Sequence, residues 1–581
     1  MNKRMALETA LFVGIGSVAW IGGGCARPVP SAQTLQTPGP ETLEQRDARM
    51  QWWREARFGL FIHWGPVSLK GTEIGWSRGG ERRGRENPEG GIPVEIYDNL
   101  YKQFNPVKFN ADEWVRIAKD AGMKYLVFTT KHHDGFVNFD SKYTDYKITS
   151  RESPFRRDIV RELADACRRG GLRLGFYYSQ PDWHHPDYRT ENHARYLEYL
   201  HNQLRELCTN YGKVDIIWFD GLGGTAKDWD AENLCAMIRR LQPGVLINNR
   251  CGLPGDFETP EQRVGSFQKE PPWETCMTIG QQWAWKPDDK IKSTRECIQT
   301  LVRAVGGDGN FLFNVGPMPD GRIEPTQVAR LREMGEWLRK YGHSVYGTRG
   351  GPFRWNQCER AAYVATCRDD LVYVHILEWP TDRLTLPPLS RGVIDATLLT
   401  GGQATVRQTE KGITVSVPAA YRQEIDTILV LKLDGPAGTI TPVAAGSDSL
   451  ARRRPAKASG HFNNLAEFGP DKAFDDDMGT RWAADAGTKQ AWLEVDLGKP
   501  CLVGRAVISE AFGKRVQEFE LQCRQDGQWK VLHRGEKLGD CATLQFAPVT
   551  AQEFRLNILK ATDGPTIWEF RLFAPDDKPG E

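Results

Sequence analysis

Residues 214–221 read Val-Asp-Ile-Ile-Trp-Phe-Asp-Gly, and this stretch decides the fold. The apolar run has the length of a buried β-strand and ends at Asp220 and Gly221. Five similar runs cover residues 58–63, 125–130, 172–178, 245–249 and 311–315. Amphipathic helical stretches separate them, at 111–121, 158–169, 193–209 and 326–341. The alternation predicts parallel strands with crossover helices. Over residues 45–343, with two less obvious strands added, it predicts an α/β barrel of the (β/α)8 type.

Polar side chains follow the predicted strands at the point where each strand ends. They are His63, the run Lys131-His132-His133-Asp134, Tyr178, Asp220 and the pair Asn249-Arg250. In a (β/α)8 barrel the C-terminal ends of all strands converge on one mouth, which is where catalysis takes place. We therefore expect these side chains to share one site.

The remainder of the chain predicts two all-β units. Alternating runs at 362–366, 371–376 and 412–417 indicate an antiparallel β-sandwich over residues 344–436. A linker at 437–449 follows, and residues 450–576 contain further predicted strands at 492–497, 505–509, 518–523 and 553–558.

The N-terminus is typical of an export signal over residues 1–25. Lys3 and Arg4 precede an apolar run at 10–21, which ends in three glycines and Cys25. Cys25 is a candidate lipid acceptor of the bacterial lipoprotein type, and residues 26–44 form a polar linker. We expect an exported protein that is periplasmic, a cell-surface lipoprotein or secreted. No later run predicts a transmembrane span.

The charge balance disfavours polyanionic partners. Lys and Arg number 76 and Asp and Glu number 75, so the formal net charge is +1. Neither nucleic acid nor an anionic membrane is an expected partner. The 19 tryptophans suit a neutral target, because flat indole faces can stack on sugar rings.

The cysteines predict neither a zinc site nor a dense disulfide framework. There are 12 of them, scattered without a CxxC pair or a Cys/His cluster. Buried free thiols are the favoured interpretation. Bridges of Cys358 with Cys367, and of Cys501 with Cys523 or Cys541, remain open.

Four sequence blocks carry a family resemblance. Residues 58–65, 125–136, 218–221 and 309–317 resemble the signature blocks of the α-L-fucosidases of glycoside hydrolase family 29. The blocks occur in the family's order, and the resemblance covers residues 45–435. It implies a barrel with an appended β-sandwich and a retaining double displacement, in which a carboxylate attacks the sugar and a second carboxyl group acts as acid and base.

The resemblance also implies site residues. Asp220 is the expected nucleophile. The residues expected to hydrogen-bond the hydroxyls of fucose are His63, His132, His133, Tyr178, Trp218 and Arg250. Glu73 and Trp76 match a sugar-contacting Glu-Trp pair, although Ile74 and Gly75 separate them here. Trp283 and Trp285 are expected to pack against the methyl group of fucose.

The acid/base is the least fixed of the expected residues. Glu261 is favoured, because its spacing from Asp220 resembles that of bacterial members and a loop bounded by Gly and Pro can bring it over the mouth. Glu258 and Glu274 remain alternatives. The acid should have a raised pKa and lie about 5 Å from the carboxyl of Asp220. No metal or other cofactor is expected in catalysis, because no HxH or HExxH spacing occurs.

The C-terminal unit resembles the discoidin, or coagulation factor type C, family of jelly-roll modules, which includes many carbohydrate-binding modules. The matching residues are 473–482, 492–498 and 569–573. The resemblance implies a structural calcium ion held by Asp475, Thr480 and Glu569, whose oxygen atoms suit that ion.

The sequence thus predicts an exo-acting α-L-fucosidase for fucosylated oligosaccharides or glycoconjugates. Two alternatives remain at this stage. One is a catalytically inactive fucose-binding lectin, and the other is a glycosidase of related specificity, such as an α-galactosidase.

Overall fold

A computed structural model describes residues 41–575, apart from residues 88, 356–361, 380–381, 445–448, 478–479, 512–514 and 540. The expected export signal at 1–25, with Cys25, lies outside the described residues, as do Cys358 and parts of both expected linkers.

Seven parallel strands form the sheet that carries the expected site, in the order β5-β4-β3-β2-β1-β7-β6. Their bounds are β1 Phe58–Ile62, β2 Tyr125–Lys131, β3 Arg173–Tyr178, β4 Ile216–Phe219, β5 Leu246–Ile247, β6 Glu274–Thr278 and β7 Asn310–Val315. All six strands expected from the sequence are present, and β6 is an additional one. A parallel sheet of this kind is consistent with the (β/α)8 fold.

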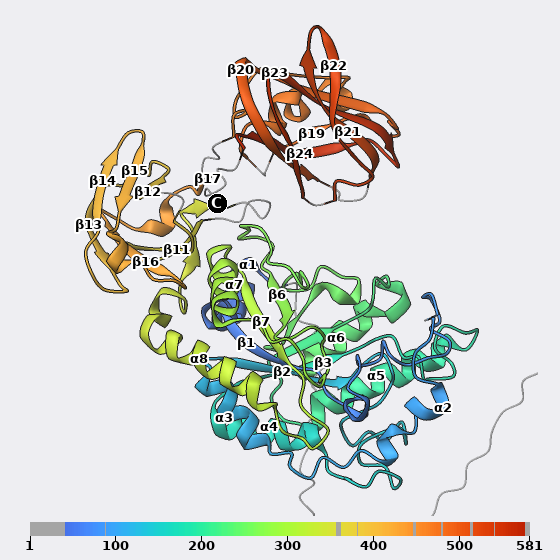
Figure 1. The fold of residues 1–581 in the computed structure, drawn as a ribbon. Helices are drawn as coiled ribbons and strands as arrows, with labels where there is room; N and C mark the ends of the chain where they lie inside the picture. Colours follow the sequence, from blue (N-terminus) through green and yellow to red (C-terminus); the bar gives the residue numbers. More distant parts are fainter. Residues whose placement is uncertain are drawn as a thin grey trace, which may run out of the picture. The chain divides into compact units, whose positions relative to one another are not determined.

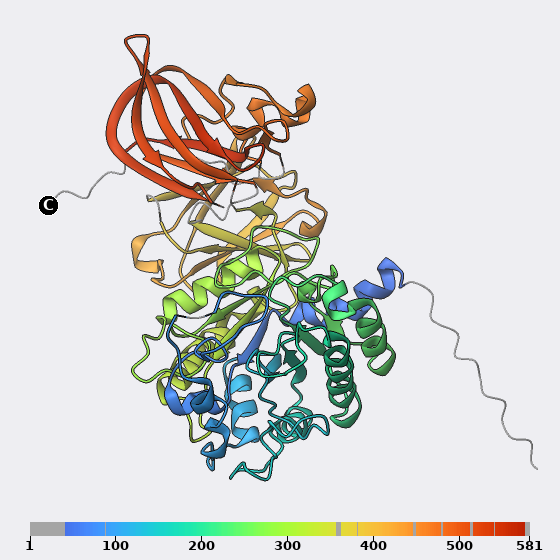
Figure 2. The same ribbon diagram turned by 90° about the vertical axis from the view of Figure 1, so that its right-hand side faces the viewer.

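Helices lie around the outside of this sheet (Figures 1 and 2). The helices of this region are α1 Leu43–Ala56, α2 Val94–Tyr97, α3 Ala111–Asp120, α4 Ile159–Gly170, α5 His193–Asn210, α6 Ala231–Leu241, α7 Thr294–Gly306 and α8 Pro325–Tyr341. Local sequence sets their ends. The Asp158 side chain caps α4 by accepting from the Arg161 N–H, and Ser293 and Glu296 form a capping box on α7. The four expected helices are confirmed.

An extended segment, residues 257–261, lies between β5 and β6. Isolated parallel bridges join Asn248 to Phe257 on one side, and Glu258 to Trp273 and Glu261 to Cys276 on the other. Successive side chains of an extended segment point to opposite faces. Because of this alternation, Glu258 and Glu261 point to opposite faces of the segment.

The enclosed side of the sheet is packed with aromatic and aliphatic side chains. Phe61, Tyr125, Tyr177 and Trp218 form one buried cluster with Val127, Ile216, Leu246, Phe257 and Leu312. This cluster fills most of the space below the strand ends, and the buried carboxylate of Glu274 accepts hydrogen bonds from three of its members, Trp53, Tyr125 and Trp218.

The middle of the chain has two antiparallel sheets and one short parallel pair, β17 with β9. A five-stranded sheet has the order β13-β16-β11-β10-β8, a three-stranded sheet has the order β12-β15-β14, and β17 pairs with β9. The bounds are β8 Arg349–Gly350, β9 Phe353–Arg354, β10 Tyr363–Arg368, β11 Leu371–Ile376, β12 Arg383–Leu386, β13 Val393–Leu398, β14 Thr405–Thr409, β15 Gly412–Ser416, β16 Thr427–Leu433 and β17 Val443–Ala444.

The C-terminal part is one antiparallel sheet, in the order β19-β24-β20-β23-β21-β22 with β18 paired to β20. Its long strands are the red arrows of Figure 2. The bounds are β18 Ala456–Ala458, β19 Trp482–Ala483, β20 Ala491–Glu510, β21 Val516–Gln525, β22 Gln528–Gly535, β23 Ala542–Ala561 and β24 Thr566–Phe573. The strands expected at 492–497 and 505–509 are one strand, β20, with a register shift between Asp496 and Cys501.

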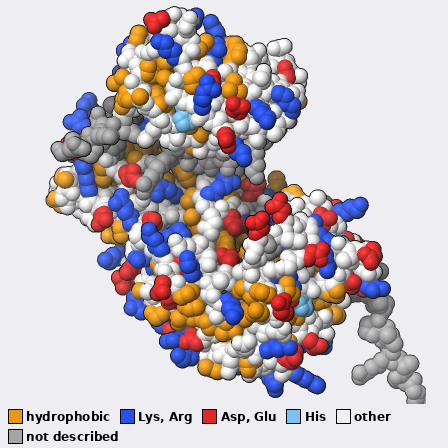
Figure 3. Space-filling model, turned by 45° about the vertical axis from the view of Figure 1, so that its right-hand side comes forward, with side chains coloured by type: hydrophobic (Ala, Val, Ile, Leu, Met, Phe, Trp, Pro, Cys, Tyr) orange, Lys and Arg blue, Asp and Glu red, His pale blue; other side chains and the backbone are white. Residues whose placement is uncertain are grey.

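Within the described part of the chain, no helix combines the length and apolar character needed to cross a membrane. Positive and negative side chains are interspersed over the face drawn in Figure 3, which agrees with the formal net charge of +1.

Candidate active site

Asp220 stands directly after β4, and two side chains donate hydrogen bonds to its carboxylate. The Tyr177 hydroxyl donates to its Oδ2 at 2.9 Å, and the Arg250 Nη1 donates to its Oδ1 at 3.1 Å. The backbone N–H of Asp220 donates to the Gln180 side chain at 2.9 Å. Gly221 is required next, because an added Cβ there would lie 2.5 Å from the Arg250 carbonyl oxygen. The carboxylate is thus held in a fixed orientation, with 12% of its side chain exposed.

A small cavity opens beside Asp220 at the C-terminal ends of the parallel strands. It is lined by Phe61, His63, Trp76, His132, His133, Tyr177, Trp218, Asp220, Leu222, Arg250, Glu261, Cys276 and Trp283. Most of the residues expected at the site are therefore brought together.

His63 is buried and uncharged at neutral pH. Burial is the main cause that lowers its pKa to about 4. The amide nitrogen of Asn314 donates to the Trp283 carbonyl at 2.7 Å, so the amide oxygen is left to accept from Nδ1 of His63 at 2.7 Å. The proton of His63 consequently sits on Nδ1, and Nε2 remains an acceptor.

His133 has the same tautomer for a similar reason. The Ser179 hydroxyl donates to the Pro181 carbonyl, so its oxygen accepts from Nδ1 of His133 at 2.6 Å. Nε2 of His133 then carries no proton and lies 3.6 Å from Asp220. Burial lowers the pKa values of His132 and His133 well below the ordinary value.

Both adjacent histidines line the cavity because the chain turns there. β2 ends at Lys131, and the next residues leave the strand in a turn. The rings of His132 and His133 lie 4.1 Å apart. Gly75, at φ 65°, approaches Nδ1 of His132 so closely that an added Cβ would lie 2.7 Å from it. The turn at Gly75 places the next residue, Trp76, in the cavity, with its ring 5.5 Å from the His133 ring.

Glu261 is the glutamate that shares the cavity with Asp220. Its Oε2 accepts from Nη2 of Arg250 at 2.8 Å, and 41% of its side chain is exposed. The Arg250 guanidinium therefore bridges the two carboxylates. Backbone alternation along residues 257–261 turns Phe257 and Glu261 inward.

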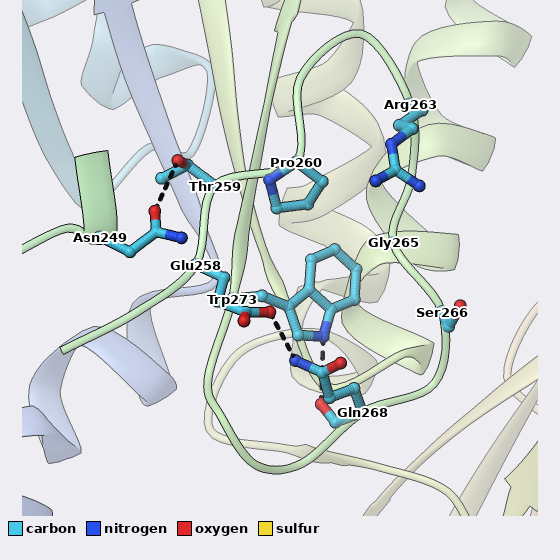
Figure 4. A pocket seen from close by; sticks show the side chains of 9 residues that line it. All are labelled: Asn249, Glu258, Thr259, Pro260, Arg263, Gly265, Ser266, Gln268 and Trp273. Carbon is cyan, nitrogen blue, oxygen red and sulfur yellow. Dashed lines mark hydrogen bonds between the residues drawn. The ribbon is translucent and has the colours of Figure 1, made fainter. Parts of the chain in front are cut away.

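The other two candidate acids lie elsewhere. Glu258 faces the opposite side of its segment, in a separate pocket where it accepts from the Gln268 amide at 3.0 Å (Figure 4). Glu274 is fully buried and accepts from Tyr125, Trp53 and Trp218. Burial raises the pKa of Glu274 to about 7, but Glu274 does not line the cavity and is therefore not placed to protonate a bound sugar.

Three expected contact residues also lie outside the cavity. The hydroxyl of Tyr178 donates to Gln203 at 2.7 Å, because Tyr178 and Tyr177 point to opposite faces of β3. Glu73 accepts from the backbone N–H groups of Trp283 and Ala284, so it positions the Trp283 segment instead of lining the cavity. Trp285 is absent from the lining, which Trp283 provides.

Four lining residues were not anticipated: Phe61, Tyr177, Leu222 and Cys276. The sequence contained a clue to one of them, Tyr177. Trp218 was expected to face the mouth, and Tyr177 is its register partner on the neighbouring strand. The sequence alone does not supply that register.

Two family models match the chain. The model described as "Alpha-L-fucosidase" matches residues 26–343, and the model described as "F5/8 type C domain" matches residues 455–570.

Known proteins are similar to the same region. The plasma α-L-fucosidase of Homo sapiens is 32% identical over 416 residues, which is 65% of this chain and 88% of that protein. The structure of α-L-fucosidase isoenzyme 1 from Paenibacillus thiaminolyticus aligns with a TM-score of 0.60 at 37% identity, covering 67% of this chain and 99% of that one.

A third structure is of an α-L-fucosidase from Bacteroides thetaiotaomicron, described as a trapped covalent intermediate in complex with 2-fluoro-fucosyl fluoride. It aligns with a TM-score of 0.58 at 33% identity and covers 67% of this chain and 96% of that one. The chain therefore belongs to the α-L-fucosidase family, glycoside hydrolase family 29, and carries an F5/8 type C domain at its C-terminus.

Proposed function

We propose that the protein is a retaining exo-α-L-fucosidase, with Asp220 as nucleophile and Glu261 as acid/base. One observation carries the assignment: both carboxylates lie in one cavity and share the Arg250 guanidinium. The relative with a trapped covalent fucosyl intermediate supports the double displacement. The substrate is a fucosylated oligosaccharide or glycoconjugate.

In the first step, one Asp220 oxygen attacks the anomeric carbon while Glu261 protonates the departing oxygen. An ion pair with arginine favours the charged form of a carboxyl group. Glu261 must therefore release Nη2 of Arg250 as it takes up its proton. Nη1 of Arg250 stays on Oδ1 of Asp220 and the Tyr177 hydroxyl stays on Oδ2, so the two donors fix the orientation of the nucleophile.

In the second step, Glu261 accepts a proton from water, and the water oxygen attacks the anomeric carbon of the fucosyl-enzyme. The Asp220 carboxylate leaves, and the sugar is released with its original anomeric configuration. Glu261 ends this step protonated, and when it loses that proton to solvent its carboxylate re-forms the ion pair with Arg250. Two displacements of this kind require the carboxyl groups of Asp220 and Glu261 to lie about 5 Å apart.

The walls of the cavity suit a deoxy sugar. Nε2 of His63 is an acceptor for a sugar hydroxyl, and neutral imidazoles avoid placing a charge against a neutral ligand. Phe61, Trp218 and Trp283 form an aromatic side of the cavity, with Phe61 5.2 Å from Trp218 and 5.9 Å from Trp283. An apolar wall of this kind suits the C5 methyl group, and the Trp283 face replaces the predicted contact with Trp285.

Hydrolysis of 4-nitrophenyl α-L-fucoside by the purified protein tests the proposal. We expect turnover by the wild type and loss of it in Asp220→Ala. A lectin would show no turnover in either protein. Trp283→Ala should reduce kcat/KM for the fucoside more than for 4-nitrophenyl α-galactoside, since the latter lacks the methyl group. A preference of the wild type for the galactoside would contradict the assignment.

We further propose that the parallel sheet closes into a (β/α)8 barrel, with residues 257–261 as the eighth strand between β5 and β6. The proposed domains are the catalytic barrel at 45–343, a β-sandwich at 344–436 and a discoidin-like jelly roll at 450–576. Residues 26–44 and 437–449 are the proposed linkers.

The C-terminal domain also offers oxygen ligands for a calcium ion. Thr480 Oγ1 lies 2.9 and 2.8 Å from the Asp475 carboxylate oxygens. The carboxylate of Glu569 is buried, and neither oxygen has a hydrogen-bond partner among the described residues. Oxygen donors around a buried carboxylate whose partner is Arg571 at 3.7 Å fit calcium. Asp475, Thr480 and Glu569 would hold the ion, and its role would be structural.

We propose export through residues 1–25, with Cys25 as a lipid acceptor, to the periplasm, the cell surface or the medium. The F5/8 type C domain would then bind carbohydrate and raise the local concentration of the catalytic domain on its substrate.

A further inference from the structure

Two cysteines lie in contact beside the candidate active site. Cys235 is on α6, Cys251 is the last residue of the 3-10 helix Asn249–Cys251, and their Sγ atoms are 3.8 Å apart. The residues are 16 positions apart in the sequence. We propose that this pair is a site of reversible oxidation, at which an external disulfide converts Cys235 and Cys251 into an intrachain disulfide.

The pair adjoins the residue that bridges the carboxylates. Arg250 precedes Cys251, and its carbonyl oxygen accepts from the Gly221 N–H at 3.1 Å and from the Gln180 amide at 3.3 Å. Gly252 follows at φ 83°, packed so closely that an added Cβ would lie 2.3 Å from the Ala226 backbone nitrogen. The sulfur of Cys251 is therefore held in place by a rigid turn, facing α6.

The two thiols differ in exposure and in acidity. Cys251 is fully buried, whereas Cys235 is partly exposed. The hydrogen bond between them lowers the pKa of Cys251, and the same hydrogen bond, with burial, raises that of Cys235. The thiolate is the attacking form of cysteine. Cys235 is thus the sulfur that an external reagent reaches, and Cys251 attacks next because its sulfur lies 3.8 Å from that of Cys235.

The reaction takes place in two exchanges. The Cys235 thiol loses its proton and attacks one sulfur of the external disulfide, so that the disulfide bond breaks and one external thiolate leaves and takes up a proton. The Cys251 thiol then loses its proton and attacks the Cys235 sulfur of the mixed disulfide, and the second external thiolate leaves and takes up a proton. Two cysteine thiols are oxidised, and one external disulfide is reduced to two thiols.

Closure needs little movement. The sulfurs must approach from 3.8 Å to about 2.05 Å, and the two side chains can share this change. The bond would tie the Arg250 segment to α6. We expect slower hydrogen exchange at residues 249–253 and a higher melting midpoint in the oxidised protein.

Peptide mapping tests the proposal on the full chain. The protein is incubated with oxidised glutathione, quenched in acid, denatured, alkylated with iodoacetamide and digested with trypsin. We expect the tryptic peptides 228–239 and 251–263 to appear joined, two hydrogens below the sum of their masses, and to separate after dithiothreitol. The joined species should persist in Cys208→Ser, which removes a buried cysteine of α5, and should be absent in Cys235→Ser.

Two results would overturn the proposal. One is full alkylation of both Cys235 and Cys251 in the treated wild type. The other is a glutathione adduct that remains on Cys235 without conversion to the joined peptides, because the second exchange would then have failed. Both results are read from the wild type, so the test does not depend on how the variants fold.

Discussion

The side chains around Asp220 have fixed proton positions, and these determine what each can do. His63 and His133 carry their protons on Nδ1, because Asn314 and Ser179 are left only with acceptor oxygens for them. His133 therefore donates nothing to Asp220. Tyr177 and Arg250 are the side chains that donate hydrogen bonds to Asp220.

Removing the Tyr177 hydroxyl should weaken catalysis without disturbing the fold. A hydrogen bond to a charged group contributes about 1.5–3 kcal/mol. Tyr177→Phe should therefore lower kcat/KM for 4-nitrophenyl α-L-fucoside by about ten- to a hundredfold. The matched control is Tyr178→Phe, whose hydroxyl bonds Gln203 outside the cavity. Equal losses of kcat/KM in both variants would show that Tyr177 has no special role at Asp220.

Glu274 should make stability depend on pH. Its pKa is raised from the ordinary value to about 7, mainly by burial. Between roughly pH 4.5 and 7 the folded protein then retains a proton that the unfolded chain has lost. Stability should fall as pH rises through this window, by about 3 kcal/mol from this group. The melting midpoint of the wild type relative to Glu274→Gln should thus be lower at pH 8 than at pH 5. A constant difference would contradict the account.

The sequence predicted the residue types at the rim but not which neighbour faces inward. Tyr178 was the expected contact and Tyr177 is the observed one, because a one-residue change in strand register exchanges the two faces. The turn after Lys131, by contrast, follows from the end of the strand, and both histidines lie where the sequence placed them. Residues in turns after strands were therefore easier to place than residues within strands.

At the scale of elements, the extended segment at 257–261 decides the acid/base. Its alternation separates Glu261, in the cavity, from Glu258, in the pocket of Figure 4. From the sequence, this segment was expected to be a loop bounded by Gly and Pro. Its pairing with β5 and β6 depends on residues that are remote in sequence, such as Trp273 and Cys276, and a local pattern does not reveal that.

Azide rescue distinguishes the roles of the carboxylates. In Glu261→Ala, azide should replace water in the second displacement, restore turnover of an activated fucoside and give the fucosyl azide of retained configuration. In Asp220→Gly, azide should attack in place of the nucleophile and give the inverted product. Glu258→Ala is the control and should need no rescue. Nuclear magnetic resonance of the products measures the configuration, and rescue of Glu258→Ala would reassign the acid/base.

At the scale of the whole molecule, the chain combines a catalytic unit with an antiparallel C-terminal domain that has its own buried charges. The pKa of Glu569 is raised to about 9 by burial, with Asp476 and Asp475 as further causes. Arg571 lies 3.7 Å away and offsets this only in part. The calcium ion proposed for this domain would favour the charged form of that carboxyl group. The family of the domain could be predicted from its sequence blocks, whereas the burial of Glu569 required the structure.

Calcium should stabilise this domain, and its affinity should depend on pH. Binding requires Glu569 to lose its proton, so affinity should increase as pH rises from 7 toward 9 and protons should be released on binding. Isothermal titration calorimetry in buffers of different ionisation enthalpy measures both effects. Glu569→Gln should abolish the calcium-induced rise in melting midpoint. A rise of equal size in wild type and variant would exclude Glu569 as a ligand.

The central claim, that Asp220 is the nucleophile, is tested most directly by trapping the intermediate with 2-fluoro-fucosyl fluoride and mapping the label. The account predicts that tryptic peptide 214–227 carries one fluorofucosyl group, and that fragmentation places it on Asp220 and not on Asp215, which bonds Arg173. A label on Asp215, on Glu261 or on any other residue would contradict it.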